Sequence, residues 1–331
     1  MVRRLFRVLA GLKILTAAAL ASLLLTGAAS AQTFPSKPIR VIIPYPAGGT
    51  VDVMLRRLVQ KINDANGPQV VIESRPGGGG VVAAQALMQA PNDGYTIMVA
   101  DVVSHALNVT MVPNLPYDPV KDFEPITMLF SFPTLLAVPA ASPVKSMADL
   151  IALAKSKPGG LSYGSAGIGT AGHLLGTMLQ KASDAPMTHV AYRGGQAALT
   201  DLVAGRIDYL FFSYSALKPF LVSNDLRLIA TAADKRLPAA ANVPTLTEAG
   251  YPNIDYDSWF GLAAPKGTDP QVIAKLREIF IPAQNSPDLV AALNEIGFVA
   301  RTGPAADLTA LIKSDTERMG KMYKDSGASV N

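Results

Sequence analysis

Apolar residues in this chain alternate between short continuous runs and longer segments with helical spacing. A short apolar run is typical of a buried strand, and apolar positions three and four residues apart are typical of one helix face. The first half of the pattern predicts strand 39–43, helix 51–62, strand 70–73, helix 81–89 and strand 95–100. Strands that alternate with helices in this way favour a parallel sheet with helices on both faces.

The alternation resumes after a proline-rich stretch at residues 113–133, which we interpret as loops. Ser146 has the position of a cap at the start of a helix. The pattern predicts strand 135–138, helix from 147, strand 161–163, helix from 170, strand 189–192, helix 197–204, strands 208–212 and 226–231, and a last strand in DSWFGLAAPKGT with two helices after it. The sequence therefore predicts two α/β units.

We expect these units to form two lobes that the chain crosses twice. Residues 32–137 and 256–331 are assigned to lobe 1, and residues 138–255 to lobe 2. The C-terminal helices have no strands of their own, so they are expected to return and cover lobe 1. The predicted fold class is α/β, each lobe a mostly parallel sheet flanked by helices, with a ligand cleft between the lobes.

The N-terminal segment has the three regions of a secretory signal peptide. Four basic residues precede an apolar run at 14–26, and Ala29-Ser30-Ala31 forms a cleavage site before Gln32. The apolar run is shorter than the roughly 20 residues that span a bilayer. An uncleaved membrane anchor is the alternative. We expect cleavage after Ala31 and a periplasmic mature protein.

The excess positive charge belongs to this segment. The chain has 29 Lys+Arg against 25 Asp+Glu, and four of the basic residues but no acidic ones lie in residues 1–31. The remaining chain is neutral, which argues against nucleic-acid binding. Zero cysteines exclude disulfides, thiolate metal sites and a thiol nucleophile. We expect a monomer without cofactor or metal.

Three glycine-rich turns lie between a predicted strand and a predicted helix, at residues 46–50, 77–80 and 164–170. A helix start carries unpaired N–H groups and a partial positive charge, and glycine lets an anion approach them closely. In α/β sheets such turns lie at the carboxyl ends of strands, where ligands bind. The turns therefore predict an anion cradle. The alternative is that each glycine only shapes a turn.

The third turn contains G-x-G-x-x-G, formed by Gly167, Gly169 and Gly172. A dinucleotide site needs an acidic residue about 20 positions later, and the next predicted strand ends without one. A nucleophile elbow needs G-x-S-x-G, whereas Ser165 lies in G-S-A-G. An anion cradle, with hydroxyl groups of Ser165 and Thr170 adding hydrogen bonds, fits the turn better. The three histidines, at 105, 173 and 189, are interpreted as capping or packing residues.

Six blocks follow one another across the mature chain: SKPIRVIIPYPAGGTVDVMLR, VIESRPGGGGVVAAQALMQAPNDGYTIMVA, LPYDPVKDFEPITML, LSYGSAGIGTAGHLLGTML, AYRGGQAALTDLVAGRIDYLFF and VPTLTEAGYPNIDYDSWFGLAAPKGT. Together they resemble the tripartite tricarboxylate transporter receptor family, also called Bug receptors. The resemblance implies a two-lobed, type II periplasmic binding protein without enzymatic activity. Such receptors close around a small organic acid, hold it largely through backbone groups and ordered water, and pass it to a membrane permease of two subunits.

The resemblance also implies two binding loops. The loop of lobe 1 comprises Tyr45, Ala47, Gly48, Gly49 and Thr50, with Asp52 at the start of its helix. The loop of lobe 2 comprises Ser165, Ile168, Gly169 and Thr170, with His173 one turn into its helix. An acid in a first helical turn interacts favourably with the helix dipole, so we expect Asp52 to order its loop rather than contact the ligand.

Phe212 departs from the family pattern, because many relatives carry an acidic residue at this place. An acid could pair with a ligand ammonium group, and a phenyl ring cannot. We therefore expect an aliphatic or aromatic carboxylate, with one or two carboxyl groups, rather than an amino acid. The alternative is that Phe212 belongs to the core.

The sequence thus predicts a receptor that captures a small organic carboxylate through backbone N–H groups of glycine-rich loops and delivers it to permease subunits. Two alternatives stay open. One is an orphan receptor that feeds a two-component signalling system, and its folded chemistry would be the same. The other is an exported serine hydrolase that uses Ser165.

Overall fold

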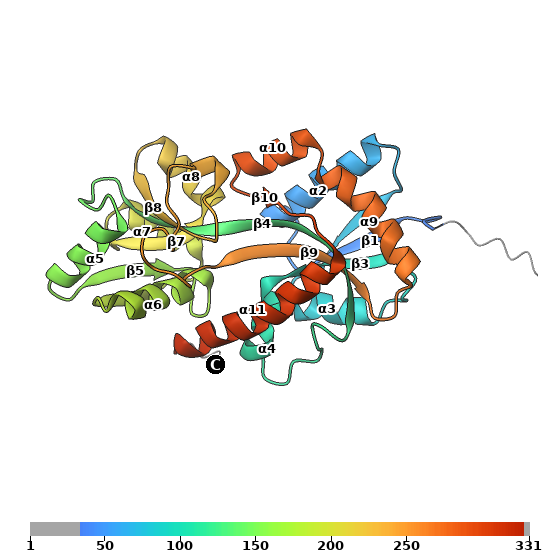
Figure 1. Cartoon of the computed structure of the whole chain (residues 1–331), viewed down its shortest axis with the longest axis horizontal. Coiled ribbons are helices and arrows are strands. Elements are labelled where there is room, and N and C mark those ends of the chain that lie inside the picture. The colour runs from blue at the N-terminus through green and yellow to red at the C-terminus, as the bar shows by residue number, and fades with distance from the viewer. Residues whose placement is uncertain (1–33, 328–331) are drawn as a thin grey trace, which may run out of the picture. The chain divides into compact units, whose positions relative to one another are not determined.

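The computed structural model describes residues 34–327, and the predicted signal peptide lies outside them. The described residues from Lys37 onward form one compact unit built on a ten-stranded sheet with helices around it (Figure 1). The predicted α/β fold class is confirmed. None of the helices within residues 34–327 combines the length and apolar composition that a membrane span requires.

One half of the sheet is built from the first part of the chain. Its elements are β1 (Ile39–Ile43), α2 (Thr50–Asp64), β2 (Val70–Ser74), η1 (Gly78–Gly80), α3 (Val81–Met88), β3 (Thr96–Asp101), η2 (Val103–Leu107) and α4 (Asn108–Met111). Strand β1 pairs in parallel with both β2 and β3. The apolar side chains of α2 recur at helical spacing and are buried, at Val51, Met54, Leu55, Leu58 and Ile62.

The other half repeats this construction. Its elements are α5 (Met147–Ser156), β5 (Leu161–Ser165), α6 (Ala171–Ser183), β6 (Met187–Ala191), α7 (Gly195–Val203), β7 (Tyr209–Ser213), α8 (Tyr214–Val222), β8 (Leu226–Ala232) and η3 (Pro238–Ala240). Strand β5 pairs in parallel with β6 and β7. Helix α5 begins as its sequence predicts, because Ser146 Oγ accepts a hydrogen bond from Asp149 N.

Two antiparallel strands, β4 (Phe123–Pro139) and β9 (Asp257–Pro265), join the halves in the order β2-β1-β3-β9-β4-β7-β5-β6. Residues 123–133 of β4 pair with β9, and residues 134–139 pair with β8, with 134–137 also pairing with β7. The change of partner lies at Pro133/Thr134, four residues before the predicted lobe boundary. The expectation of mostly parallel sheets needs correction, because the joining strands make the sheet mixed.

The chain ends with α9 (Pro270–Gln284), α10 (Pro287–Glu295), β10 (Val299–Ala300) and α11 (Ala305–Asp325). Helix α9 packs against α2 and β4, and β10 pairs with β4. Helix α11 packs against β4 and η2 and also reaches α6 in the second half. The C-terminal helices therefore cover the first half of the sheet and contact the second.

Candidate functional site

The first glycine turn connects β1 to α2 and is held by Asp52. Gly48 has a φ of +80°, a conformation that suits glycine. Its N–H donates to Oδ2 of Asp52 at 2.8 Å, and Nε of Arg56 donates to the same oxygen at 2.9 Å. The N–H of Gly49 donates to the carbonyl of Pro46 at 3.3 Å. Both glycine N–H groups are thus used inside the turn.

The electrostatics of Asp52 fit this ordering role. The hydrogen bond from Arg56, and after it the bond from Gly48 N–H, hold the pKa of the carboxyl below its usual value against the opposing effect of burial. Asp52 is 2% exposed, so its charge faces the turn and not solvent. Thr50 is the first residue of α2, and Ala47 lies on the exposed outer part of the turn.

The turn of the second predicted binding loop, at residues 164–170, connects β5 to α6 and is held in the same way by His173. Gly169 has a φ of +79°, and its N–H donates to Nδ1 of His173 at 3.1 Å. The hydroxyl of Thr170 donates to the carbonyl of Gly167 at 2.7 Å. Ile168 is 58% exposed.

The two turns have the same local construction. Each has a glycine at a φ near +80°, followed by an extended residue at the helix N-cap, with φ/ψ of −70°/167° before α2 and −74°/162° before α6. The third helical residue, Asp52 or His173, then accepts a hydrogen bond from the glycine N–H. The N–H groups that remain for a ligand are therefore those of the first helical turn, which an α-helix cannot satisfy internally.

A stack of aromatic rings packs next to the turn between β5 and α6. The ring centroids of His173 and His189 lie 4.1 Å apart. The ring of Tyr163, the residue of β5 paired with His189 of β6, lies 5.0 Å from that of His189. Burial, and after it the neighbouring His173, lowers the pKa of His189 from 6.5 to about 4. Burial also lowers the pKa of His173. Neutral imidazoles suit this position, because Nδ1 of His173 must accept a hydrogen bond.

Ser165 and His189 form a close pair, with Oγ and Nε2 2.7 Å apart. Their other contacts are structural: Ser165 Oγ donates to the carbonyl of Gly167 and accepts from its N–H. Ser165 is 3% exposed, so its hydroxyl cannot reach a substrate. No carboxylate among the described residues is hydrogen-bonded to either partner, so the orienting acid of a triad is missing.

The glycine turn at residues 77–80 shapes the packing of the first half of the sheet. Gly78, Gly79 and Gly80 all have positive φ, and Nδ2 of Asn108 donates to the carbonyl of Gly79 at 3.0 Å. A Cβ on Gly80 would lie 2.7 Å from Cβ of Ser104. The turn is thus packed against η2 and α4, as expected for glycines that only shape a turn.

A cavity of about 280 Å³ lies between the two halves of the sheet. It is lined by residues of the first half, of the joining strands and of the second half: Tyr45, Pro46, Gly49, Val51, Val102, Val103, Phe132, Ser213, Ser215, Tyr256, Ser258, Phe260 and Phe298. Two helices begin at this cavity. Gly49 is the N-cap of α2, and Ser213 is the N-cap of α8.

A model of the tripartite tricarboxylate transporter receptor family matches residues 54–328. The chain belongs to this family. BugT of Bordetella pertussis is 30% identical over 302 residues, which cover 91% of this chain and 93% of BugT. An adipate-bound protein of R. palustris is 31% identical, with a TM-score of 0.75 and coverage of 89% of this chain and 99% of that one. MatC from Rhodopseudomonas palustris, with bound malate, is 28% identical, with a TM-score of 0.70 and coverage of 88% and 100%.

As a tripartite tricarboxylate transporter receptor, the chain is a periplasmic-type solute-binding protein and not an enzyme. The close Ser165–His189 pair therefore belongs to the support of the second turn. This agrees with the interpretation of the histidines as capping and packing residues, and it removes the hydrolase alternative.

The cavity of the receptor includes only part of the predicted site. Tyr45 and Gly49 line it, whereas the predicted residues of the second turn, from Ser165 to His173, do not. A Cβ on Gly169 would lie 3.3 Å from the ring of Tyr323 in α11, so this turn packs against the C-terminal helix. In the described residues, the second half of the sheet contributes to the cavity through Ser213 and Ser215 instead.

Phe212 also lies outside the cavity of the receptor. Its ring lies beside Gly195, where an added Cβ would meet Cζ of Phe212 at 2.0 Å. The ring packs against the buried cluster under α7 and α8. This placement matches the core interpretation, and a ligand contact of Phe212 stays a prediction.

Sequence reasoning missed most of the cavity wall. Phe132 and Tyr256 lie in or next to segments that look like loops, and Ser258 and Phe260 lie in a strand whose facing the sequence does not reveal. One signal was available: Ser213 directly precedes a helical segment, which is the position of an N-cap. Its side chain makes no capping hydrogen bond, so its hydroxyl is directed elsewhere.

Tyr45 lines the cavity and lies near the buried acid Asp101. Burial, then the charge of Asp101, raises the pKa of the tyrosine well above its usual value. Asp101 accepts the N–H groups of Val103 and Ser104, each at 2.8 Å. Burial raises the pKa of Asp101 despite these bonds.

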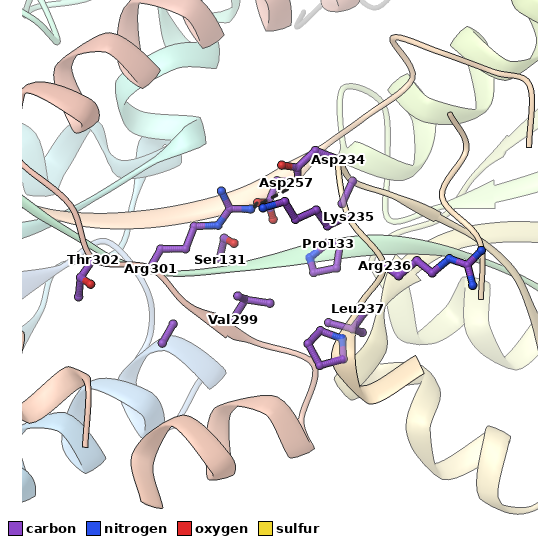
Figure 2. A pocket seen from close by; sticks show the side chains of 13 residues that line it. Ser131, Pro133, Asp234, Lys235, Arg236, Leu237, Asp257, Val299, Arg301 and Thr302 are labelled. Atoms are coloured by element: carbon purple, nitrogen blue, oxygen red, sulfur yellow. Dashed lines mark hydrogen bonds and ion pairs between the residues drawn. The ribbon is translucent and has the colours of Figure 1, made fainter. Parts of the chain in front are cut away.

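A second cavity, of about 480 Å³, lies on the opposite face of the joining strands. Ser131 and Asp257 line it, whereas the next residue of each strand, Phe132 and Ser258, lines the first cavity. Figure 2 shows Arg301 beside Asp257 and Asp234; its Nη2 lies 2.6 Å from Oδ2 of Asp257 and 3.7 Å from Oδ1 of Asp234. Burial raises the pKa of Asp257 although the charge of Arg301 opposes it.

Proposed function

We propose that this receptor captures a small organic carboxylate in the cavity between the two halves of its sheet. The observation that carries the proposal is the arrangement of two helix N-termini, those of α2 and α8, at one cavity of about 280 Å³. Each helix start contributes roughly 0.3–2 kcal/mol to holding an anion, because its N–H groups and dipole favour negative charge. The adipate and malate bound by the two relatives support a carboxylate.

The predicted turns contribute to this site in different ways. The first turn delivers the start of α2 to the cavity and is ordered by Asp52. The second turn has the same construction but packs against α11, so we propose that it reaches the ligand when the two lobes close. The crossing strands β4 and β9 are the natural hinge, since they are the main connections between the halves.

We further propose that the receptor is exported, cleaved after Ala31 and delivers its ligand to the membrane subunits of a tripartite transporter. The family description and the signal-like N-terminus support this assignment. N-terminal sequencing of the exported protein tests the cleavage site. Co-purification from membranes with permease subunits, with and without ligand, tests delivery.

The first experiment is thermal unfolding of residues 32–331 against mono-, di- and tricarboxylates, aromatic carboxylates and acidic amino acids. A ligand at about 100 times its Kd adds roughly 2.7 kcal/mol of stability, enough to raise the Tm by several degrees. We expect a shift with carboxylates and none with neutral amides of the same acids. A protein refolded from denaturant that responds to no acid would contradict the proposal.

Ser215→Ala tests whether the cavity is the site. Ser215 lies in the first turn of α8 and lines the cavity, so loss of its hydroxyl should weaken every carboxylate that binds. Ser326→Ala, in the C-terminal segment after α11, is a control because Ser326 is not one of the cavity residues. Equal affinities of both variants and the wild type would place the ligand elsewhere.

A further inference from the structure

The second cavity, of about 480 Å³, has one wall from each half of the sheet. Residues 233–238, which follow β8, form the wall of the second half, and residues 299–302, which include β10, form the wall of the first half. The joining strands contribute Ser131, Pro133 and Asp257. The cavity therefore lies behind the proposed hinge, on the face of β4 and β9 opposite to the ligand cavity.

Each wall is fixed to its own half of the sheet. Strand β10 pairs with residues 130–131 of β4, in the part of that strand that pairs with β9, and Nε2 of Gln284 in α9 donates to the carbonyl of Arg301 at 2.7 Å. In the other wall, Nε of Arg236 donates to both carboxylate oxygens of Glu248, at 3.1 and 2.9 Å. We therefore expect each wall to move with its half.

One side chain connects the two walls. Nη2 of Arg301 lies 2.6 Å from Oδ2 of Asp257, at the start of β9, and 3.7 Å from Oδ1 of Asp234 in the opposite wall (Figure 2). Among the described residues, the pair with Asp234 is the ion pair that joins the two walls. Both side chains are partly exposed, 40% for Arg301 and 65% for Asp234, so a variant at Asp234 should fold normally.

Closure of the halves changes the two cavities in opposite senses. They lie on opposite faces of the joining strands, so a rotation about these strands that narrows the ligand cavity widens the second cavity. The predicted binding residues at 165–173 stay outside the ligand cavity, as expected for halves that have not closed. At 3.7 Å, the pair of Arg301 with Asp234 is already near the roughly 4 Å limit of an ion pair, so a small widening separates it.

From this arrangement we infer that the ion pair between Arg301 and Asp234 favours the open arrangement of the halves and thereby lowers the affinity of the receptor for its ligand. The inference rests on the proposed function, and it names two residues that regulate the ligand cavity from the opposite face. A contact made only in the open state reduces the fraction of protein that is competent to bind, and the apparent Kd rises accordingly. An exposed ion pair of up to about 1 kcal/mol corresponds to a change of up to about fivefold in Kd.

Variants of Asp234 test the inference by calorimetric titration with adipate and malate. Asp234→Asn removes the pair and leaves Arg301 bound to Asp257, and we expect it to bind either acid about two- to fivefold more tightly than the wild type. Asp234→Lys adds repulsion between like charges, so its gain in affinity should be about the square of that of Asp234→Asn.

Glu278→Gln and Glu278→Lys are the matched controls. They make the same changes of charge, and Glu278 pairs with Lys275 inside α9, with a side-chain exposure of 63% against 65% for Asp234. We expect both controls to bind within about 1.5-fold of the wild type. Equal gains in the Glu278 and Asp234 variants would assign the effect to net charge and overturn the inference, as would an unchanged affinity in Asp234→Lys.

Closure itself is measured with spin labels, since the chain contains no cysteine that would react with them. Asn242→Cys carries one label in the second half, and Asn285→Cys carries the other at the end of α9; both positions are exposed and neither lines the second cavity. Without any acid, we expect Asp234→Lys to shift the distances from pulsed electron paramagnetic resonance toward longer values. Saturating adipate or malate should shift the wild type in the same direction.

The two measurements separate this inference from the proposed function. An unchanged or shorter distance in Asp234→Lys without acid would overturn the inference, even if adipate or malate binds. A longer distance in this variant, with no acid binding to either protein, would support the role of the ion pair while the proposed function fails.

Discussion

The backbone N–H of Gly169 donates to Nδ1 of His173, four residues later, at 3.1 Å. Gly48 and Asp52 stand in the same relationship, with a distance of 2.8 Å from the N–H to Oδ2. The two halves of the receptor thus order their first βα turns by one device with two different acceptors. The acceptor is a carboxylate in one half and a neutral imidazole in the other, so the two turns respond differently to substitution and to pH.

Replacing Asp52 by Ala should disorder the first turn. The variant leaves the Gly48 N–H without its acceptor, and we expect a loss of about 1–3 kcal/mol in the free energy of unfolding together with weaker ligand binding. Arg56→Ala is the control, because Arg56 has 60% side-chain exposure and its ion pair should contribute under about 1 kcal/mol. Urea unfolding and titration calorimetry measure the two effects. Unchanged affinity in Asp52→Ala would contradict an ordering role.

Alanine at Gly48 or Gly169 should weaken ligand binding by about tenfold or more. Both glycines have φ near +80°, a conformation that costs other residues about 1–2 kcal/mol. We expect the turn to move in each alanine variant, because this movement relieves the strain. Gly205→Ala is the matched control, since Gly205 has a φ of +68°, open space around it and no place in the cavity. We expect all three variants to lose similar stability and only the first two to lose affinity. Wild-type affinity in both would refute the role of the turns.

Acid should destabilise the receptor between pH 6.5 and 4. In the folded state the pKa of His189 is about 4, against 6.5 for the free group, so the unfolded chain binds more protons in this window. The stability that the protein gains from keeping His189 neutral is fully present above pH 6.5, and the free energy of unfolding decreases as the pH falls toward 4. Burial also lowers the pKa of His173, and it lowers that of His105 to about 3, so both groups act in the same direction.

Urea midpoints at pH 7.5, 6 and 5 measure this dependence. His189→Gln removes one of the three titrating groups, so its midpoint should fall less steeply between pH 6.5 and 4 than that of the wild type. Identical slopes for the two proteins would mean that burial of His189 does not contribute.

Replacing Arg301 by Gln should destabilise the joint between the halves. Arg301 lies in the second cavity and is the cation nearest Asp257, whose Oδ1 is buried without a hydrogen bond. We expect a loss of about 1–3 kcal/mol at pH 7, less than for a fully buried pair because Arg301 has 40% side-chain exposure. Adding Asp257→Asn should restore part of this loss, as urea unfolding would measure. A double variant less stable than Arg301→Gln would contradict the charge explanation.

Ser165→Ala should leave any slow cleavage of p-nitrophenyl acetate unchanged, because the buried hydroxyl cannot reach an ester. We expect a loss of about 1 kcal/mol in stability from its hydrogen bonds to Gly167 and His189. A loss of ester cleavage with the serine would reopen the question of catalysis.

The sequence determined the elements whose signals are local. The buried run at 39–43, the apolar spacing of α2 and the cap at Ser146 all appear where their patterns predict them. The position of Asp52 in a first helical turn also predicts that it orders its loop, and its hydrogen bond from Gly48 N–H agrees with this, because the helix dipole and the unpaired N–H groups act within a few residues.

The tertiary structure decided the joint between the halves and the cavity wall. Residues 123–134 contain two prolines, at 125 and 133, and look like loop, yet they belong to the 17-residue strand β4. The sheet tolerates these prolines because Pro125 lies at a register shift and Pro133 opposes the first residue of β9, where β4 changes partners. Both conditions depend on strands more than 120 residues away.

The tertiary structure also decided which face of the sheet each side chain lies on. Phe132 and Ser131 are neighbours in sequence, yet they line cavities on opposite faces of the sheet, because successive residues of a strand alternate. The sequence shows which residues can hold an anion, since helix starts and glycines are local features. Which helix starts meet at one cavity depends on the crossing of β4 and β9, and for this reason α8, and not the predicted α6, begins at the cavity.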